Sequence, residues 1–200
     1  EINGAGPVIP AAALEELFAK LDCLRSGDVL VLAGSIPVSL PDDIYQRILA
    51  RLADREILTA VDATRDLLRA VLPYRPFLIK PNRSELGELF GRTPADDQEI
   101  EDCARRLQEE GARNVLVSMA GDGSLLLDET GGVHRLGVPK GAVRNSVGAG
   151  DSMVAGFLAG WLEHGDYALA HRLGTAAGAA TAFSEGLAAR DQVLALMETF

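Results

Sequence analysis

One short segment combines glycines with a carboxylate at the start of a predicted helix. It reads Asn145-Ser146-Val147-Gly148-Ala149-Gly150-Asp151 and leads into an apolar stretch of helical period. Glycines let consecutive backbone N–H groups converge, and a helix N-terminus adds partial positive charge, so Gly148, Ala149 and Gly150 form a candidate anion hole for a phosphoryl group. Asp151 has two interpretations: it caps the helix, or it accepts a proton from a hydroxyl that attacks the bound phosphate.

A second polar segment, Lys80-Pro81-Asn82-Arg83-Ser84-Glu85, directly follows a predicted strand. Asn82 and Glu85 are three positions apart at a predicted helix start, and this spacing is typical of a capping box. The same two oxygen-bearing side chains also suit Mg²⁺, which keeps most of its waters and takes few protein ligands. Both interpretations stay open on the sequence.

Two further loops also follow predicted strands. The segment 118–123 carries Gly121 and Gly123, which would let a loop wrap a nucleotide phosphate or base, although a plain hairpin turn uses the same residues. Ser35, in the segment 33–37, places a hydroxyl at the end of another strand. Ligands of such sheets bind beyond the carboxyl ends of the strands, so these loops are where chemistry is expected.

The elements that must position these loops alternate between short apolar runs and longer segments of helical period. This alternation predicts an α/β fold, a mostly parallel sheet with helices on its faces. The predicted strands are 28–33, 57–62, 76–80, 114–119, 124–128 and 133–138. The predicted helices are 11–21, 42–53, 65–72, 84–90 and 97–110, then one from the Gly148 turn to about residue 163 and one from Tyr167 to about Ser184.

The connection at 129–132 is too short for a crossover helix, so the last two strands should pair as an antiparallel hairpin at one edge of the sheet. The final predicted helix is rich in small residues, including Ala176–Ala180. Small residues there allow either close packing of another helix or the approach of a flat ligand. The sequence contains no internal repeat and no obvious linker between domains.

Composition limits the partners. The 200 residues are 48% hydrophobic, which supplies a core for one domain. Acidic residues outnumber basic ones 29 to 19, and the net charge of −10 argues against nucleic acid or an anionic membrane as a partner.

Cys23 and Cys103 have no metal-site or disulfide-scaffold spacing, and we expect inert thiols. Without a signal segment or a spanning apolar stretch of about 20 residues, the expected location is the cytoplasm.

Several common catalytic motifs are absent from the sequence. It contains no GxxxxGK[ST], no GxSxG and no HExxH, and Met153 stands where a dinucleotide-binding fingerprint would need its third glycine. His134, His164 and His171 are scattered and have no metal-ligand spacing. P-loop, Rossmann, serine-hydrolase and zinc-protease chemistry are therefore disfavoured.

Taken together and in this order, the segments 80–85, 118–123 and 145–151 resemble the PfkB, or ribokinase, family of carbohydrate kinases. Glu1–Pro7, Gly34–Pro37 and Ala182–Leu187 are similar to the branch of this family that acts on phosphorylated sugars, and most similar to its members that act on fructose 1-phosphate. The resemblance covers essentially the whole chain. It implies a three-layer α/β/α ribokinase-like fold.

The resemblance also implies a reaction, the transfer of the ATP γ-phosphate to fructose 1-phosphate to give fructose 1,6-bisphosphate. Tagatose 6-phosphate and fructose 6-phosphate are the alternative substrates. By the same resemblance Asp151 is the catalytic base and Gly148–Gly150 the anion hole. The remaining implied roles are metal binding, mainly through water, by Asn82 and Glu85; nucleotide binding by Asn82, Ser118, Gly121, Gly123 and Thr175; and substrate binding by Ser35.

The chain departs from the family pattern at a few positions. Ala120 stands where glycine is usual, which would strain the backbone if a positive φ is needed there. Thr64-Arg65 replaces a usual Ser-Gly pair, and Asn145 replaces an aspartate of some members, which puts a monovalent-cation site in doubt. These changes keep a second function class open: a regulator that binds nucleotide or sugar phosphate without turnover.

Family members carry a further N-terminal part, with sugar-binding residues and a small β lid, that has no counterpart here. The resemblance therefore implies that residues 1–200 are the C-terminal nucleotide-binding and catalytic portion of a ribokinase-like domain. Such a portion alone is expected to be inactive, because neither positioning of the acceptor nor exclusion of water would survive. The full-length protein is expected to be a homodimer that pairs through the lid.

Overall fold

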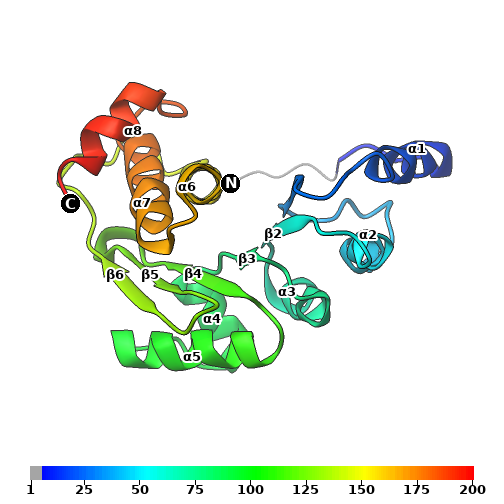
Figure 1. Ribbon diagram of the computed structural model, residues 1–200, viewed down its shortest axis with the longest axis horizontal. Helices are drawn as coiled ribbons and strands as arrows, with labels where there is room; N and C mark the ends of the chain where they lie inside the picture. Colours follow the sequence, from blue (N-terminus) through cyan, green and yellow to red (C-terminus); the bar gives the residue numbers. More distant parts are fainter. Residues whose placement is uncertain (1–5) are drawn as a thin grey trace.

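The strands form one six-stranded sheet between two layers of helices in the computed structural model, which describes residues 6–200 (Figure 1). Their order in the sheet follows the chain: β1 (Val29–Ala33), β2 (Leu58–Asp62), β3 (Leu78–Ile79), β4 (Asn114–Ser118), β5 (Ser124–Leu127) and β6 (Val133–Leu136). The first four strands run parallel, and β4, β5 and β6 pair antiparallel. The predicted hairpin of the last two strands is confirmed. The pairing of β4 with β5 is antiparallel as well, because only Met119–Gly123 connects them.

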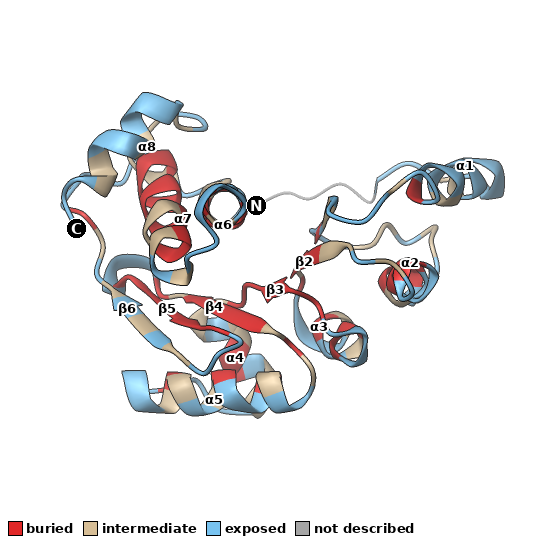
Figure 2. Cartoon of the chain, in the orientation of Figure 1, coloured by how far each residue is buried: buried red, intermediate tan, exposed pale blue. Residues whose placement is uncertain are grey.

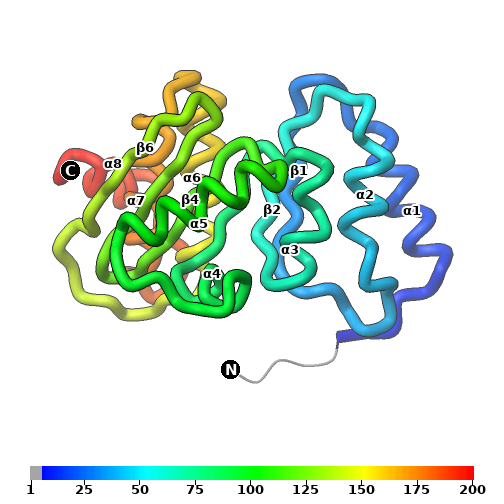
Figure 3. Tube along the Cα trace, turned by 90° about the horizontal axis from the view of Figure 1, so that it is seen from below, coloured from blue at the N-terminus to red at the C-terminus, as the bar shows by residue number. Residues whose placement is uncertain are grey.

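Five helices cover one face of the sheet, and two cover the other. The first layer contains α1 (Ala11–Leu21), α2 (Ile44–Leu52), α3 (Arg65–Val71), α4 (Arg83–Phe90) and α5 (Asp97–Glu109). The second layer contains α6 (Ala149–His164) and α7 (Tyr167–Ala182), and α8 (Arg190–Met197) packs on α7. The α1–α2 pair and the α6–α8 group lie at opposite ends of the molecule (Figure 3). The predicted three-layer α/β/α class is confirmed, although α8 was not predicted.

Alternation along the strands produces two separate cores. Val61, Ile79 and Val115 point into the layer of α1–α5, and their neighbours Ala60 and Leu78 point toward α6 and α7. Successive strand residues face opposite sides, so strands covered on both faces read as continuous apolar runs. Figure 2 shows the central strands buried along their length. The apolar runs of the sequence therefore mark strands that are covered on both faces.

Local signals explain where particular elements begin and end. Asp96 accepts a hydrogen bond from the Glu99 N–H at 2.9 Å and caps α5. The strand predicted at 76–80 is shorter in the structure, where β3 spans only Leu78–Ile79, because the flanking Pro76 and Pro81 have no N–H to donate.

The small residues of α7 serve helix packing. A Cβ added to Gly174 would lie 2.9 Å from the Met153 carbonyl oxygen on α6, and one added to Gly178 would lie 3.1 Å from the Ala149 carbonyl oxygen. The two helices approach closely only because these positions carry no side chain. The packing interpretation of this stretch is therefore confirmed.

No helix within residues 6–200 is both long and apolar enough to cross a membrane. Most of the N-terminal segment Glu1–Pro7, which carries part of the family resemblance, lies outside the described residues.

Candidate active site

The polar loops predicted from the sequence meet at the carboxyl edge of the parallel strands. The Gly34 N–H, just before Ser35, donates to the Asp62 carbonyl at 3.2 Å. Asn82 and Ser118 form a parallel β-bridge. The amino group of Lys80 lies beside Gly150 at the start of α6. Loops that are far apart in the sequence therefore form one continuous rim.

A buried ion pair lies at the centre of this rim. Lys80 Nζ is 3.2 Å from Asp62 Oδ2, and the two side chains are only 6% and 18% exposed. A Cβ built at Gly150 would lie 3.2 Å from the same Nζ, so the absence of a side chain there allows the ammonium to approach the helix start. Sequence reasoning did not include Lys80 or Asp62 among the site residues. The available signal was a charged residue at the carboxyl end of each of two neighbouring buried strands.

The electrostatics of the rim are dominated by carboxylates. Burial raises the pKa of Asp62, and the nearby charge of Asp151 raises it further, while Lys80 opposes both effects. Burial also raises the pKa of Glu85, against the lowering effects of the Asn82 N–H bond and of Lys80. Lys80 therefore acts on two carboxylates, Asp62 and Glu85, while the charge of a third, Asp151, acts on Asp62. Such a surplus of negative charge favours an additional cation.

The glycine turn before α6 has the conformation and the free N–H groups of an anion site. Gly148 is the N-cap residue with φ of +80°, a left-handed conformation that favours glycine. The Ala149 N–H donates to the Ser146 carbonyl at 3.2 Å. The N–H groups of Gly148 and Gly150 have no acceptor within residues 6–200. The turn therefore presents two unpaired donors next to the Lys80 ammonium.

Asp151 occupies the first turn of α6 and is exposed to solvent. In the described part of the chain its carboxylate makes no hydrogen bond and no ion pair, and the N-cap position belongs to Gly148. The structure therefore gives the capping interpretation no support. The carboxylate remains free to accept a proton at the rim.

Asn82 and Glu85 form the predicted capping box. Asn82 Oδ1 accepts from the Glu85 N–H at 2.9 Å, and Glu85 Oε2 accepts from the Asn82 N–H at 2.7 Å. The metal interpretation is compatible with this geometry, because the capping bonds use Oε2 and leave Oε1 of Glu85 for a water molecule. Within residues 6–200, no three Asp, Glu, His or Cys side chains are grouped around one point. The oxygen donors of Asn82 and Glu85 are of the hard type that magnesium takes, few in number, while it keeps most of its waters.

The loop 118–123 is the hairpin connection between β4 and β5. It contains a 3₁₀ turn, Ala120–Asp122, and the Met119 N–H donates to the Gly123 carbonyl at 2.8 Å. Gly123 has φ of +95°, and a Cβ there would lie 2.9 Å from Gly137 Cα. The turn interpretation is therefore confirmed. The exposed Gly121 and the rim position of Ser118 leave the nucleotide interpretation open.

Two positions that depart from the family pattern have left-handed backbones. Ala120 has φ of +48°, and Arg65 has φ of +52°. A non-glycine residue in this conformation costs roughly 1 kcal/mol. The strain expected at Ala120 is therefore present, and Arg65 carries the same strain where glycine is usual.

Thr175 lies in the interior, on the part of α7 that contacts Ser124 of β5. Its side chain is 2% exposed, and its hydroxyl donates to the His171 carbonyl at 2.9 Å. Ser124 Oγ lies 2.7 Å from Thr175 Oγ1 and 2.7 Å from His171 Nε2. The Thr175 hydroxyl is therefore already bonded within the protein. Ser35, by contrast, is exposed at the end of β1.

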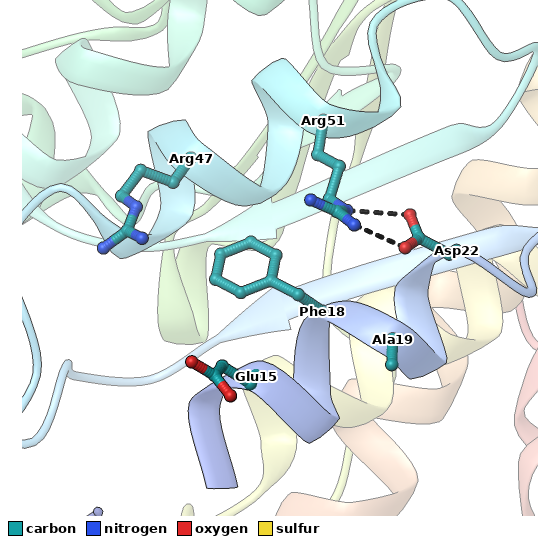
Figure 4. Close-up of a pocket in the computed structure, with 6 residues that line it drawn as sticks. All are labelled: Glu15, Phe18, Ala19, Asp22, Arg47 and Arg51. Atoms are coloured by element: carbon teal, nitrogen blue, oxygen red, sulfur yellow. Dashed lines mark hydrogen bonds and ion pairs between the residues drawn. The ribbon is translucent and has the colours of Figure 1, made fainter. Parts of the chain in front are cut away.

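A surface hollow of about 410 Å³ lies away from this rim, between α1 and α2 (Figure 4). Arg47 and Arg51 stack against the Phe18 ring at 5.4 and 5.5 Å, and Arg51 also pairs with Asp22. These contacts join the two helices to each other. We assign the hollow to helix packing.

Comparisons with known proteins agree with this architecture. The profile of the pfkB family of carbohydrate kinases matches residues 2–192. The chain is 44% identical to a 1-phosphofructokinase of Bacillus subtilis over 98% of its own length and 65% of that protein. It is 38% identical to a D-tagatose-1-phosphate kinase of Bacillus licheniformis over 94% of its own length and 62% of that protein. The chain thus spans less than two thirds of these curated relatives.

A solved structure shows the same arrangement of elements. Phosphofructokinase-2 from Escherichia coli, in complex with fructose-6-phosphate, superposes with a TM-score of 0.87 at 25% identity. The alignment covers 96% of this chain and 62% of that one.

Proposed function

Because the chain belongs to the pfkB family of carbohydrate kinases, we propose that it is the nucleotide-binding and catalytic portion of a sugar-phosphate kinase. The reaction is transfer of the ATP γ-phosphoryl group to a hydroxyl of a phosphorylated sugar. One observation carries the proposal: the unbonded carboxylate of Asp151 directly follows a glycine turn in which two backbone N–H groups have no acceptor within residues 6–200 and Gly150 lies beside the buried Lys80 ammonium. A base next to an anion site is what phosphoryl transfer to a hydroxyl requires.

Asp151 is the proposed general base. Its exposed position in the first turn of α6 lets it meet a hydroxyl that enters from solvent. As the hydroxyl oxygen attacks phosphorus and the bond to the ADP oxygen breaks, its proton passes to the Asp151 carboxylate. This transfer avoids a positively charged oxygen in the product.

Gly148–Gly150 is the proposed anion hole. The N–H groups of Gly148 and Gly150 and the ammonium of Lys80 are positioned before the substrate arrives, because the glycine turn and the Asp62 ion pair hold them in place. Preorganised donors of this kind stabilise the negative charge that develops on the transferred group. They also hold the phosphoryl group in line with the incoming hydroxyl.

Nucleotide binding is assigned to the rim next to Asp151. Asn82, Ser118, Gly121 and Gly123 would contact the nucleotide, and Thr175 would contribute to the shape of the base site from beneath, since its hydroxyl is bonded internally. Asn82 and Glu85 would hold a magnesium ion mainly through its waters. Such an ion would supply positive charge that offsets the charge of the phosphates.

Fructose 1-phosphate is the proposed sugar substrate, and Ser35 is the proposed contact for the sugar phosphate. The similarity to a 1-phosphofructokinase at 44% identity supports this choice. The similarity to a D-tagatose-1-phosphate kinase supports tagatose 1-phosphate as a second candidate substrate. The fructose-6-phosphate complex of the structural neighbour supports fructose 6-phosphate as a third.

We propose that the full-length protein acts as a homodimer.

The test is ATP-dependent phosphorylation by the full-length protein that carries this sequence, assayed by ADP release with fructose 1-phosphate, tagatose 1-phosphate, tagatose 6-phosphate and fructose 6-phosphate in parallel. Asp151→Asn should lower kcat by about 10²- to 10⁴-fold, with ATP binding retained. Asp191→Asn is the matched control, because Asp191 is also an exposed carboxylate in a first helical turn, that of α8. Equal activity of Asp151→Asn and wild type would refute the proposed base.

A regulator without turnover is the second candidate function, favoured by the strained Ala120 and Arg65. It predicts ATP or sugar-phosphate binding with no ADP release from any of the sugars tested. A free Asp151 carboxylate has no role in such a protein, so we rank it second.

A further inference from the structure

An ion pair joins two loops of the rim that the proposed mechanism uses separately. Arg83 Nη1 donates to Asp122 Oδ2 at 2.9 Å. Arg83 is the first residue of α4, directly after Asn82, and Asp122 ends the 3₁₀ turn of the loop 118–123. The contact therefore connects the Asn82 segment to the far side of the β4–β5 loop.

Backbone contacts fix the base of this loop and close its turn, where the Asp122 N–H donates to the Met119 carbonyl at 3.0 Å. The Ser118 N–H donates to the Pro81 carbonyl at 3.1 Å, and the Met119 N–H closes the loop onto Gly123. The tip, Ala120–Asp122, contains the left-handed Ala120, and both Ala120 and Asp122 are exposed. A strained conformation persists only where its surroundings over-determine it. Within residues 6–200, the Arg83 ion pair is the side-chain contact that ties this tip to another element, α4.

The arginine is well placed to hold the tip because its own position is constrained. Its side chain is 29% exposed, and its Nε is buried with no acceptor within residues 6–200. The guanidinium is rigid and planar, so packing around Nε sets the direction in which Nη1 points. Asp122, at 63% exposed, is the less buried partner of the pair.

We propose that Arg83 is a positioning residue that holds the loop 118–123 in the conformation that receives the nucleotide. This inference rests on the proposed function. The ion pair joins the two segments to which nucleotide contacts are assigned, so its loss should loosen one segment relative to the other. Nucleotide affinity should fall while the chemical step, at Asp151, stays nearly unchanged.

The first experiment measures the loop itself and needs no ligand. Amide hydrogen exchange of the segment 118–124 should be about two- to fivefold faster in Asp122→Asn than in wild type, as expected for loss of a partly exposed ion pair. Asp122 is exposed, so this variant avoids disturbing the core. Arg105→Ala is the control, because it removes an exposed Arg105–Glu101 pair within α5. Unchanged exchange in Asp122→Asn would overturn the inference.

The second experiment measures nucleotide affinity and turnover in the full-length protein. Arg83→Ala and Asp122→Asn should each raise the dissociation constant of Mg-ATP and its KM about two- to fivefold, with kcat within twofold of wild type. Arg83→Lys should recover part of the loss, and the exchanged pair Arg83→Asp/Asp122→Arg should recover more than either reversed variant alone. Normal Mg-ATP affinity in the single variants, or an equal fall in kcat, would overturn the inference.

The two proposals fail in different ways. If the wild-type protein binds no Mg-ATP, the proposed function fails, and this inference fails with it. If the wild type binds and turns over Mg-ATP but the ion-pair variants match it, only the inference about Arg83 is wrong.

Discussion

Lys80 and Ser124 both lie in buried polar clusters, but the two clusters satisfy their polar groups differently. Lys80 pairs with Asp62 at the open carboxyl edge of the sheet, next to backbone donors that have no acceptor in the described chain. Ser124 is fully buried and lies between His171 and Thr175, with both contacts at 2.7 Å. The first cluster retains unused binding capacity, whereas the second uses its hydroxyls internally.

The difference separates the proposed binding site from a structural network. A charged pair in a low-dielectric position contributes little net stability and leaves a large penalty when one partner is removed. A neutral hydroxyl network specifies how elements pack, and here it joins β5 to α7. We therefore expect mutations in the first cluster to affect both stability and nucleotide affinity, and mutation of Ser124 or His171 in the second to affect stability alone.

The largest expected effect is that of Lys80→Met. It leaves the Asp62 carboxylate without its partner, and the free energy of unfolding should fall by roughly 2–4 kcal/mol, measured by urea denaturation. Mg-ATP affinity should also fall, because the ammonium beside Gly150 is lost. Lys20→Met, on the exposed side of α1, is the control and should change stability by less than about 0.5 kcal/mol.

The double variant Lys80→Met/Asp62→Asn sharpens this test. Removal of the unpaired charge should restore part of the lost stability, while the loss of nucleotide affinity should remain. A Lys80→Met protein as stable as the Lys20→Met control would show that the ion pair is not a structural element.

Ser124→Ala should have a smaller effect, confined to stability. It removes the hydrogen-bonding partner of His171 and Thr175 in the interior, and the free energy of unfolding should fall by about 1–2 kcal/mol. Mg-ATP affinity should stay within twofold of wild type. Ser26→Ala, at an exposed serine that donates to Glu56, is the control. A large loss of Mg-ATP affinity in Ser124→Ala would erase the distinction between the two clusters.

A further prediction concerns the pH dependence of stability. Burial, reinforced by the positive charges of His134 and Arg135, lowers the pKa of His171 from 6.5 to about 3. The unfolded chain therefore binds one more proton than the folded protein between these values. The resulting stability is fully present above pH 6.5 and is lost as the pH falls toward 3, at up to about 1.4 kcal/mol per pH unit.

Urea denaturation of wild type and His171→Gln between pH 7 and pH 5 measures this slope. The variant should be less stable at pH 7, and its stability should fall less steeply as the pH decreases. His164→Gln, at a half-exposed histidine near the end of α6, should keep the wild-type slope. Equal slopes in wild type and His171→Gln would show that His171 is not the group that titrates.

The sequence by itself determined the features that depend on near neighbours in the chain. The alternation of apolar runs with helical segments predicted six strands, the α/β class and the bounds of α1. It could do so because periodicity sets which face of an element is buried. Asn82 and Glu85 were predictable as a capping box, since the two residues are three positions apart. The glycine turn at Gly148 and the strain at Ala120 are likewise local backbone properties.

Only the tertiary structure decided which distant side chains meet. The pairing of Lys80 with Asp62 depends on the register between β2 and β3, and that of Arg83 with Asp122 on the bridge between Asn82 and Ser118. The position of Thr175 was likewise undetermined, because small residues on a helix indicate close packing but not the depth at which a hydroxyl lies. Helix propensity and spacing act within a few residues, whereas these contacts follow from how sheet and helices pack. The chemistry of the rim therefore appears in the sequence as separate segments, and only the fold joins them.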